Sequence, residues 1–199
     1  PESPDLQHLL ARMRDARCDV VAMEVSSHAL DLERTFASSF AVTAFSNLTQ
    51  DHLDYHHTFE AYFEAKARLF SKDYPARRVI CIDDKWGKEL LRRCSEAGDS
   101  VVTTGFDRSA LIHPKDVQYY PTHTSITLNV RGSYYEFDYP LVGKFNVENI
   151  MCAFGIGIQL GIGVSTIIDA LREAPQIPGR LERVHTPHDG GVSVFVDYA

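Results

Sequence analysis

The chain has 199 residues, of which 44% are hydrophobic and 24% are charged, and its formal net charge is -7 at pH 7. A chain of this length and composition can bury one substantial core, so we expect an ordinary globular domain. The negative charge, without a run rich in lysine and arginine, argues against nucleic-acid binding. No apolar run approaches the roughly 20 residues of a membrane span and no signal peptide opens the sequence, so we predict no membrane insertion.

The four cysteines are widely spaced and form no Cys-x-x-Cys pair: Cys18, Cys81, Cys94 and Cys152. Such spacing is typical of reduced thiols rather than of a disulfide framework or a zinc site. We therefore predict a cytoplasmic location. The oligomeric state is left open by the sequence.

Hydrophobic spacing and capping residues predict helices at residues 3–17, 58–70, 85–97, 143–161 and 165–173. Apolar runs predict strands at residues 18–25, 40–48, 77–83, 100–104 and 192–196. Residues 117–139 instead alternate between apolar and polar side chains around a turn at 131–133, which indicates an antiparallel hairpin. We predict an α/β fold with an open, mainly parallel sheet flanked by helices and a small antiparallel β-hairpin subregion.

Lys66 occupies an unusual position in the predicted helix at residues 58–70. At about 100° per residue, it falls within an apolar stripe made by Phe59, Tyr62, Phe63, Leu69 and Phe70. An ammonium group on a buried face needs a counter-charge or loses its proton, because desolvation lowers the pKa of lysine. Lys66 could be a reactive neutral amine, pair with Glu24, or extend to the surface.

The loop before this helix, from Asp51 to His57, combines carboxylates and imidazoles at the end of a predicted strand. Oxygen ligands with a single imidazole suit a hard cation such as Mg²⁺ or Mn²⁺. In such a centre one or two histidines would contact the metal, and the aspartates would brace them or start the helix. Glu24 lies near the end of another predicted strand, where it either joins this site or pairs with an arginine.

Asn146 and Asn149 lie at i and i+3 on one face of the predicted helix at residues 143–161. Their amides could contact a planar base, and Asn146 could equally be a helix cap. No Gly-x-x-x-x-Gly-Lys-[Ser/Thr] sequence occurs, so these residues contain no phosphate-binding loop of the P-loop type.

Ordered motifs along the chain resemble the central domain of the Mur ligase family. They are Met23-Glu24-Val25-Ser26-Ser27-His28, the stretch from Asn47 to His56, Glu64-Ala65-Lys66, residues 143–149, Pro178-Gly179-Arg180-Leu181-Glu182 and Val196-Asp197-Tyr198-Ala199. Their order and spacing are most similar to the branch that adds the third amino acid to UDP-N-acetylmuramoyl-L-alanyl-D-glutamate. The resemblance implies an ATP-dependent ligase of peptidoglycan synthesis.

The resemblance implies a carbamate at Lys66. Carbon dioxide would add to the neutral amine, and the resulting anion would help to hold Mg²⁺ near the γ-phosphate of ATP. Glu24 and His52 match the other metal-site residues of the family. All three residues are therefore expected to be catalytic and to bind the metal.

Ser26 and Arg34 match family residues that hold the UDP-muramoyl dipeptide, although a glutamine often found two residues before the arginine is Leu32 here. The implied reaction forms an acyl phosphate from ATP and the D-glutamyl carboxylate. The amino group of a free amino acid then attacks it, and the protein contributes positioning and charge stabilisation.

The nucleotide contacts of the family match residues in the second half of the chain. Asn149 and Asn146 match the asparagines that bind adenine. Arg180 and Asp197 match residues near the phosphates and the ribose. These four residues are the predicted ATP-binding positions.

The resemblance also implies that residues 1–199 are an incomplete central ATPase domain. The family's N-terminal UDP-binding domain, its P-loop segment and the C-terminal domain that selects the amino acid have no counterpart in this sequence. We therefore expect no peptide-bond formation by these residues alone. The sequence does not distinguish meso-diaminopimelate, lysine or another amino acid as the one added.

Three other functions fit parts of the sequence. One is an amide ligase similar to folylpolyglutamate synthetase, which the Ser26-Ser27-His28 segment and Arg34 disfavour. Another is a metal-dependent phosphohydrolase built on the histidine and aspartate loop, which would hydrolyse nucleotide without an amino acid. A binding module that only keeps the fold would be stabilised by neither metal nor nucleotide.

Overall fold

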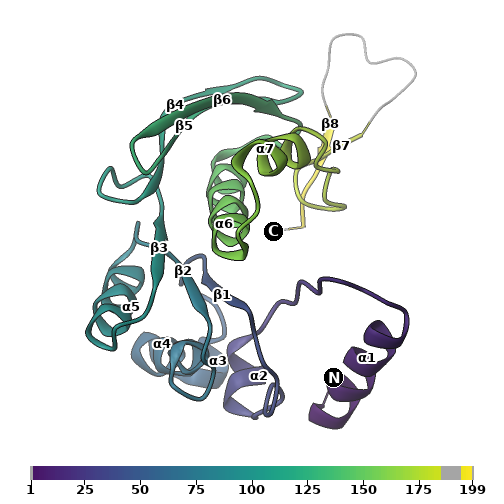
Figure 1. Ribbon diagram of the computed structural model, residues 1–199, viewed down its shortest axis with the longest axis vertical. Helices are drawn as coiled ribbons and strands as arrows, with labels where there is room; N and C mark the ends of the chain where they lie inside the picture. Colours follow the sequence, from purple (N-terminus) through teal and green to yellow (C-terminus); the bar gives the residue numbers. More distant parts are fainter. Residues whose placement is uncertain (1, 185–193, 199) are drawn as a thin grey trace. The chain divides into compact units, whose positions relative to one another are not determined.

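The structure is a computed structural model and describes residues 2–184 and 194–198 (Figure 1). Its helices are α1 (Ser3–Asp15), α2 (Ser27–Asp31), α3 (Leu53–His56), α4 (Phe59–Ala67), the 3₁₀ helix η1 (Arg68–Phe70), α5 (Lys85–Glu96), α6 (Lys144–Leu160) and α7 (Val164–Arg172). Its strands are β1 (Val42–Phe45), β2 (Arg77–Cys81), β3 (Val101–Thr104), β4 (Ile112–Tyr119), β5 (Thr124–Val130), β6 (Ser133–Tyr139), β7 (Glu182–Val184) and β8 (Val194–Val196). No helix in these described ranges has the length and apolar character of a membrane span.

Six strands form one sheet in the order β1-β2-β3-β4-β5-β6, and β7 pairs with β8 in a separate antiparallel sheet. Strands β2, β3 and β4 run parallel, whereas β4, β5 and β6 form an antiparallel meander. The predicted α/β class, with a parallel part and an antiparallel subregion, is confirmed. The antiparallel part has three strands rather than the two of the predicted hairpin. The additional strand is β4, which begins at Ile112 and pairs antiparallel with β5.

The chain divides into two compact units. Unit 1 comprises residues 1–43 and 48–77, and unit 2 comprises residues 44–47 and 78–199. In unit 2, α6 and α7 lie on one face of the antiparallel strands (Figure 1). The core between them is formed by Val102, Ile112, Ile126, Leu128, Val130, Phe137, Tyr139, Leu141, Val147, Ile150, Met151, Phe154, Ile167 and Ile168.

The parallel part of unit 2 depends on small residues where helices approach the sheet. A Cβ added to Gly155 of α6 would lie 2.8 Å from Cγ1 of Val79 in β2. A Cβ added to Gly87 of α5 would overlap the carbonyl oxygen of Cys81. Both helices can therefore pack at backbone distance only because these positions lack a side chain.

Unit 1 is built mainly from short helices. The predicted helix at residues 58–70 is formed by α4 followed by η1, and it begins where the Thr58 Oγ1 accepts a hydrogen bond from the Ala61 N–H at 3.1 Å. Most of its predicted apolar stripe is buried: Tyr62, Phe63, Leu69 and Phe70. The stripe fixes which side of α4 faces the interior of the unit.

The predicted strand at residues 18–25 is wrong. These residues have no regular secondary structure, and the Val20 side chain is 74% exposed. A strand covered on both faces needs neighbouring strands and helices, and no strand in the described part of the chain pairs with this segment. Its apolar composition alone therefore did not determine a strand.

Several element boundaries also differ from the prediction. Helix α7 is capped by Gly163 rather than by Ser165. Of the predicted strand at 192–196, residues 194–196 form β8 and the first two lie outside the described residues. The short elements α2, α3 and β7 were not predicted. All four cysteines are free thiols, as expected.

Candidate active site

The predicted metal loop lies in unit 1, between β1 and α4. His52 and His57 flank α3 and have positive φ angles of 54° and 64°, which are uncommon for residues other than glycine. The Asp51 carboxylate accepts a hydrogen bond from the His52 backbone N–H at 2.8 Å and lies 3.5 Å from His52 Nδ1. The loop therefore holds the His52 ring next to a carboxylate that can orient it.

Lys66 is half-buried on α4. Its Nζ lies 5.3 Å from the centre of the Tyr62 ring, within the range of a cation–π contact. Burial lowers the pKa of the Lys66 ammonium, and the nearby Glu24 and Asp51 carboxylates oppose that change because they favour the charged form. The predicted effect of burial on Lys66 is thus present in the structure.

Tyr62 lies beside two of the predicted metal-site residues, His52 and Lys66. It is only 4% exposed, and its ring centre lies 5.9 Å from that of His52, with the rings nearly perpendicular. Lys66 borders the same ring, and Glu24 acts electrostatically on Lys66. Glu24, His52 and Lys66 therefore share one neighbourhood of unit 1, although they come from three separate segments.

The donor types of this neighbourhood fit a magnesium ion. Within residues 2–184 and 194–198, no group of three or more His, Cys, Asp or Glu side chains could hold a metal. Glu24 and His52 provide one carboxylate and one imidazole, so a third ligand would have to be the carbamate expected at Lys66. A carbamate beside Glu24 and Asp51 would concentrate negative oxygen atoms, the ligands that Mg²⁺ prefers.

His56 has a supporting position rather than an exposed one. Its Nε2 forms a buried 2.8 Å hydrogen bond with Ser27 Oγ. Burial lowers the pKa of His56, and the neighbouring His28 lowers it further. The His28 ring in turn lies 4.7 Å from the His52 ring. This set of contacts connects α2 to the metal loop, which sequence spacing did not reveal.

The two predicted substrate residues flank α2. The Ser26 Oγ accepts a hydrogen bond from the Ala29 N–H at 3.1 Å, so Ser26 is the N-cap of the helix. Arg34 follows the C-terminal end of α2, and its Nη2 lies 2.9 Å from the Glu2 Oε1. The Arg34 Nε is buried and has no hydrogen-bond partner among the described residues. Leu32, the departure from the family pattern, is 51% exposed.

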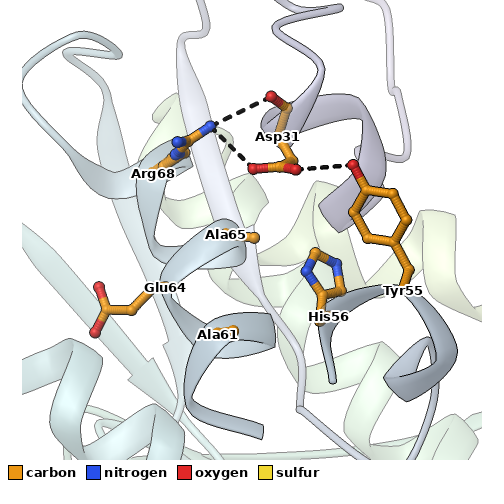
Figure 2. A pocket seen from close by; sticks show the side chains of 7 residues that line it. All are labelled: Asp31, Tyr55, His56, Ala61, Glu64, Ala65 and Arg68. Carbon is orange, nitrogen blue, oxygen red and sulfur yellow. Dashed lines mark hydrogen bonds and ion pairs between the residues drawn. The ribbon is translucent and has the colours of Figure 1, made fainter. Parts of the chain in front are cut away.

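A pocket of about 490 Å³ lies beside α4 in unit 1 (Figure 2). Figure 2 shows Tyr55 and Arg68 both directed at Asp31, whose carboxylate accepts a 2.8 Å hydrogen bond from the Tyr55 hydroxyl and lies 3.4 Å from Arg68 Nη1. Ala61 and Ala65 line the pocket, and their single methyl groups leave it open. None of the predicted site residues lines this pocket, and small residues at i and i+4 were its only signal in the sequence.

In unit 2, the two predicted adenine-binding asparagines have different surroundings. Asn146 is buried, and its Nδ2 donates to the Val142 carbonyl oxygen at 2.8 Å. Asn149 is exposed, and its Nδ2 lies 3.4 Å from Asn146 Oδ1. Asn146 therefore stabilises the start of α6, and Asn149 is the one that can reach a ligand.

Arg180 and Asp197 are brought together at the β7–β8 pair. Arg180 Nη1 donates to the Tyr198 carbonyl oxygen at 2.9 Å, and the Asp197 Oδ1 accepts from the Leu181 N–H at 3.3 Å. Gly179, with φ of 68°, packs against the Tyr198 ring, where a Cβ would overlap the ring. Two motifs that are far apart in the sequence thus contact each other at one end of the β7–β8 pair.

Comparison with known proteins identifies the class of protein that this fold and these residues define. The family described as Mur ligase middle domain matches residues 1–157. The chain therefore belongs to the Mur ligase middle domain family, and the resemblance seen in the sequence is confirmed.

Within that family, the chain is similar to UDP-N-acetylmuramoyl-L-alanyl-D-glutamate–2,6-diaminopimelate ligases. It is 42% identical over 200 residues to the enzyme from a Nostoc species, covering 100% of this chain and 40% of the relative. The Corynebacterium glutamicum enzyme is 38% identical over 204 residues, and the chain spans 38% of its length. The chain thus spans about two fifths of the length of these relatives.

Solved structures agree on the fold. The structure of a UDP-N-acetylmuramoyl-L-alanyl-D-glutamate–2,6-diaminopimelate ligase has a TM-score of 0.85 and 27% identity, covering 94% of this chain and 39% of that one. A MurF ligase from Thermotoga maritima, solved in complex with ADP, has a TM-score of 0.65 and 20% identity, covering 81% and 35%. The second likeness concerns the fold alone.

Proposed function

We propose that this chain is the central part of an ATP-dependent carbon–nitrogen ligase that joins 2,6-diaminopimelate to UDP-N-acetylmuramoyl-L-alanyl-D-glutamate in the cytoplasm. The observation that carries the proposal is the match over the whole chain to ligases named for that reaction, at 42% identity. The choice of diaminopimelate follows the names of the same relatives. The positions of His52 and Lys66 beside Tyr62, with the Glu24 carboxylate acting on Lys66, support the chemistry.

Glu24, His52 and a carbamylated Lys66 would hold Mg²⁺. The ion, when bound, would neutralise the charge of the phosphoryl group that moves from ATP. The lowered pKa of Lys66 favours the neutral amine that carbon dioxide requires. Asp51 orients His52 through its carboxylate, and Tyr62 excludes water from one side of the lysine.

Arg34 would bind an anionic group of the muramoyl dipeptide. Its side chain is partly exposed, and its Nε is buried. A guanidinium binds carboxylates through parallel hydrogen bonds, which orient the substrate as well as attract it. Ser26, the cap of α2, would contact the same substrate through its hydroxyl.

The nucleotide would be contacted by residues of unit 2. Asn149 has an exposed amide that can pair with a base edge, whereas Asn146 holds the start of α6 in place. Arg180 and Asp197 lie at the same end of the β7–β8 pair and are both exposed, so a cation and a carboxylate are available for phosphates and ribose hydroxyls. A P-loop from the rest of a full-length ligase would complete this site.

The test is a reaction with the full-length protein, ATP, Mg²⁺ and UDP-N-acetylmuramoyl-L-alanyl-D-glutamate. Phosphate release should require both the muramoyl dipeptide and diaminopimelate, and mass spectrometry should detect the tripeptide product. Lysine in place of diaminopimelate should give far less product. Turnover with lysine but not with diaminopimelate would overturn the choice of amino acid alone.

The rival functions give different outcomes in the same assay. A folylpolyglutamate-type ligase would consume ATP with a folate and glutamate instead of the muramoyl substrate. A phosphohydrolase would release phosphate from nucleotide with no amino acid, and residues 1–199 alone would suffice. A binding module would show no turnover and no shift of melting temperature with Mg²⁺ or nucleotide.

A further inference from the structure

The segment that carries Arg34 is a non-helical turn after α2, comprising residues 32–38. The Arg34 backbone N–H donates to the Ala29 carbonyl oxygen at 2.7 Å, which ties the turn to α2. Glu33 and Ala37 have φ of 53° and 60°, in the left-handed region that non-glycine residues rarely adopt. Such backbone persists only when surrounding contacts hold it, so the position of Arg34 needs support from outside the turn.

Helix α1 supplies that support at two points. The Glu2 Oε1 lies 2.9 Å from Arg34 Nη2. One turn further along α1, Gln7 Nε2 donates to Ser38 Oγ at 3.1 Å and approaches the Phe36 carbonyl oxygen at 3.5 Å. The first contact is at Arg34 and the second is at Phe36 and Ser38, so the N-terminal part of α1 holds both halves of the turn.

Glu2 is itself held in place. It is the residue before the first turn of α1, and its carbonyl oxygen accepts the Leu6 N–H at 3.0 Å. Leu6 is 5% exposed and anchors α1 in unit 1. The Glu2 side chain is 67% exposed, and it reaches the guanidinium from a backbone position that α1 fixes.

The contact leaves part of the guanidinium available. Glu2 occupies Nη2, and Nε is buried without a partner, so Nη1 is the edge that can still donate to a ligand. The Arg34 side chain is 32% exposed, which is consistent with one accessible edge. The Glu2 carboxylate at Nη2 therefore orients the Arg34 guanidinium and leaves its Nη1 free to bind a second anion.

We propose that Glu2 is a positioning residue for Arg34, holding its guanidinium so that Nη1 meets an anionic carboxylate of the muramoyl dipeptide. This inference rests on the proposed function for the identity of the substrate. A competing role, in which Glu2 occupies Arg34 until the substrate displaces it, predicts the opposite sign: its removal would strengthen substrate binding.

The experiment compares Glu2→Gln with wild type in the full-length enzyme. The amide keeps the size of the side chain and removes the charge. KM for the muramoyl dipeptide should rise about two- to fivefold, the range expected for a partly exposed ion pair, whereas KM for ATP should stay unchanged. Glu2→Asp should recover part of the loss. Asp15→Asn removes an exposed carboxylate at the other end of α1, which pairs with Arg14 and not with Arg34, and it should leave both constants unchanged.

Coupling to Arg34 separates positioning from a general effect on folding. In an Arg34→Lys background, Glu2→Gln should change KM for the muramoyl dipeptide by less than twofold. The reason is that the guanidinium that Glu2 orients is already absent. An unchanged or lowered KM in Glu2→Gln, or an equal effect in the Arg34→Lys background, would overturn the inference.

A readout that needs no turnover keeps this inference distinct from the proposed function. Arginine side-chain NMR of the wild-type enzyme should show slowed exchange of the Arg34 Nη protons, with Arg34→Lys assigning the signal, and faster exchange in Glu2→Gln. If the wild-type enzyme neither binds nor converts the muramoyl dipeptide, the proposed function is contradicted. The difference in Arg34 proton exchange between wild type and Glu2→Gln would still hold. Identical exchange in wild type and Glu2→Gln would refute the positioning role itself.

Discussion

Units 1 and 2 of the chain are built on different principles. Unit 2 contains the large continuous core between α6, α7 and the antiparallel strands. Unit 1 has short helices and holds all three predicted metal-site residues. Of the described non-glycine residues with positive φ, unit 1 contains Arg17, Glu33, Ala37, His52 and His57, and unit 2 contains Arg131 and Leu181. The strained backbone thus gathers in the unit that carries the candidate chemistry.

The difference also appears in how polar groups are used. In unit 2 the buried Arg78 pairs with Asp99 at 3.2 Å, and Gln159 Nε2 donates to the Arg78 carbonyl oxygen at 2.8 Å. The Gln159 contact joins α6 to β2, and both contacts serve the fold. In unit 1 the half-buried Lys66 lies near carboxylates without that kind of close pairing. Substitutions in the core of unit 2 should therefore affect stability first, and those at the predicted metal-site residues of unit 1 should affect activity first.

The largest expected effect is on the core of unit 2. Phe154 is fully buried in α6, so Phe154→Ala should lower the free energy of unfolding by about 3–5 kcal/mol through lost burial and an empty cavity. Urea unfolding measures this. Tyr134→Ala, at a side chain that is 58% exposed, is the control and should change stability little. A loss below about 1 kcal/mol for Phe154→Ala would show that this core is not the main source of stability.

The matching prediction for unit 1 concerns activity. In the full-length enzyme, Lys66→Ala should reduce turnover by roughly 10²–10³-fold, the usual cost of removing a group that stabilises transition-state charge, with the melting temperature nearly unchanged. A short carboxylate added to the buffer should restore part of the activity. Lys72→Ala, an exposed lysine of the same unit, is the control. A Lys66→Ala enzyme that is active and indifferent to carboxylate would remove the carbamate from the account.

A third prediction tests the close approach of α5 to β2. Gly87→Ala should destabilise the protein by about 1–3 kcal/mol, because the new Cβ would overlap the Cys81 carbonyl oxygen. Thermal unfolding followed by circular dichroism measures it. Gly163→Ala places a methyl group with no atom nearer than 3.9 Å and should change stability by less. Equal effects of the two substitutions would mean that α5 can move away from β2 at little cost.

The smallest predicted effect is a pH dependence in unit 1. Burial lowers the pKa of His56 in the folded state, so the unfolded chain takes up its proton first as the pH falls through about 6.5. Stability should therefore decrease between pH 7 and pH 5, and His56→Gln should flatten this slope. His8→Gln, at an exposed residue of α1, should leave the slope intact. A slope that is the same in all three proteins would assign the acid sensitivity to other groups.

The sequence predicted most of unit 2 because its elements carry strong local signals. The alternation around the turn at 131–133 and the apolar spacing of α6 each determine an element almost independently of the rest of the chain. The strand predicted at residues 18–25 failed for the opposite reason. An apolar run becomes a strand only if a neighbour pairs with it, which is a property of the assembled sheet.

The candidate site was predicted only in part for a related physical reason. Lys66 was noticeable because a lysine within an apolar stripe requires an explanation, and its burial is present in the structure. The contacts of Glu2 with Arg34 and of His56 with Ser27 join residues about 30 positions apart. No spacing rule connects such residues, so only the folded chain reveals them.

The most direct test of the site is the chemical state of Lys66 in the full-length enzyme. Protein equilibrated with ¹³C-labelled bicarbonate and Mg²⁺ should show one protein-bound carbamate signal by ¹³C NMR, and the signal should be absent from Lys66→Ala. Glu24→Gln should weaken it, because the metal that stabilises the carbamate would lose a ligand. Identical spectra for wild type and Lys66→Ala would contradict a carbamylated lysine at this site.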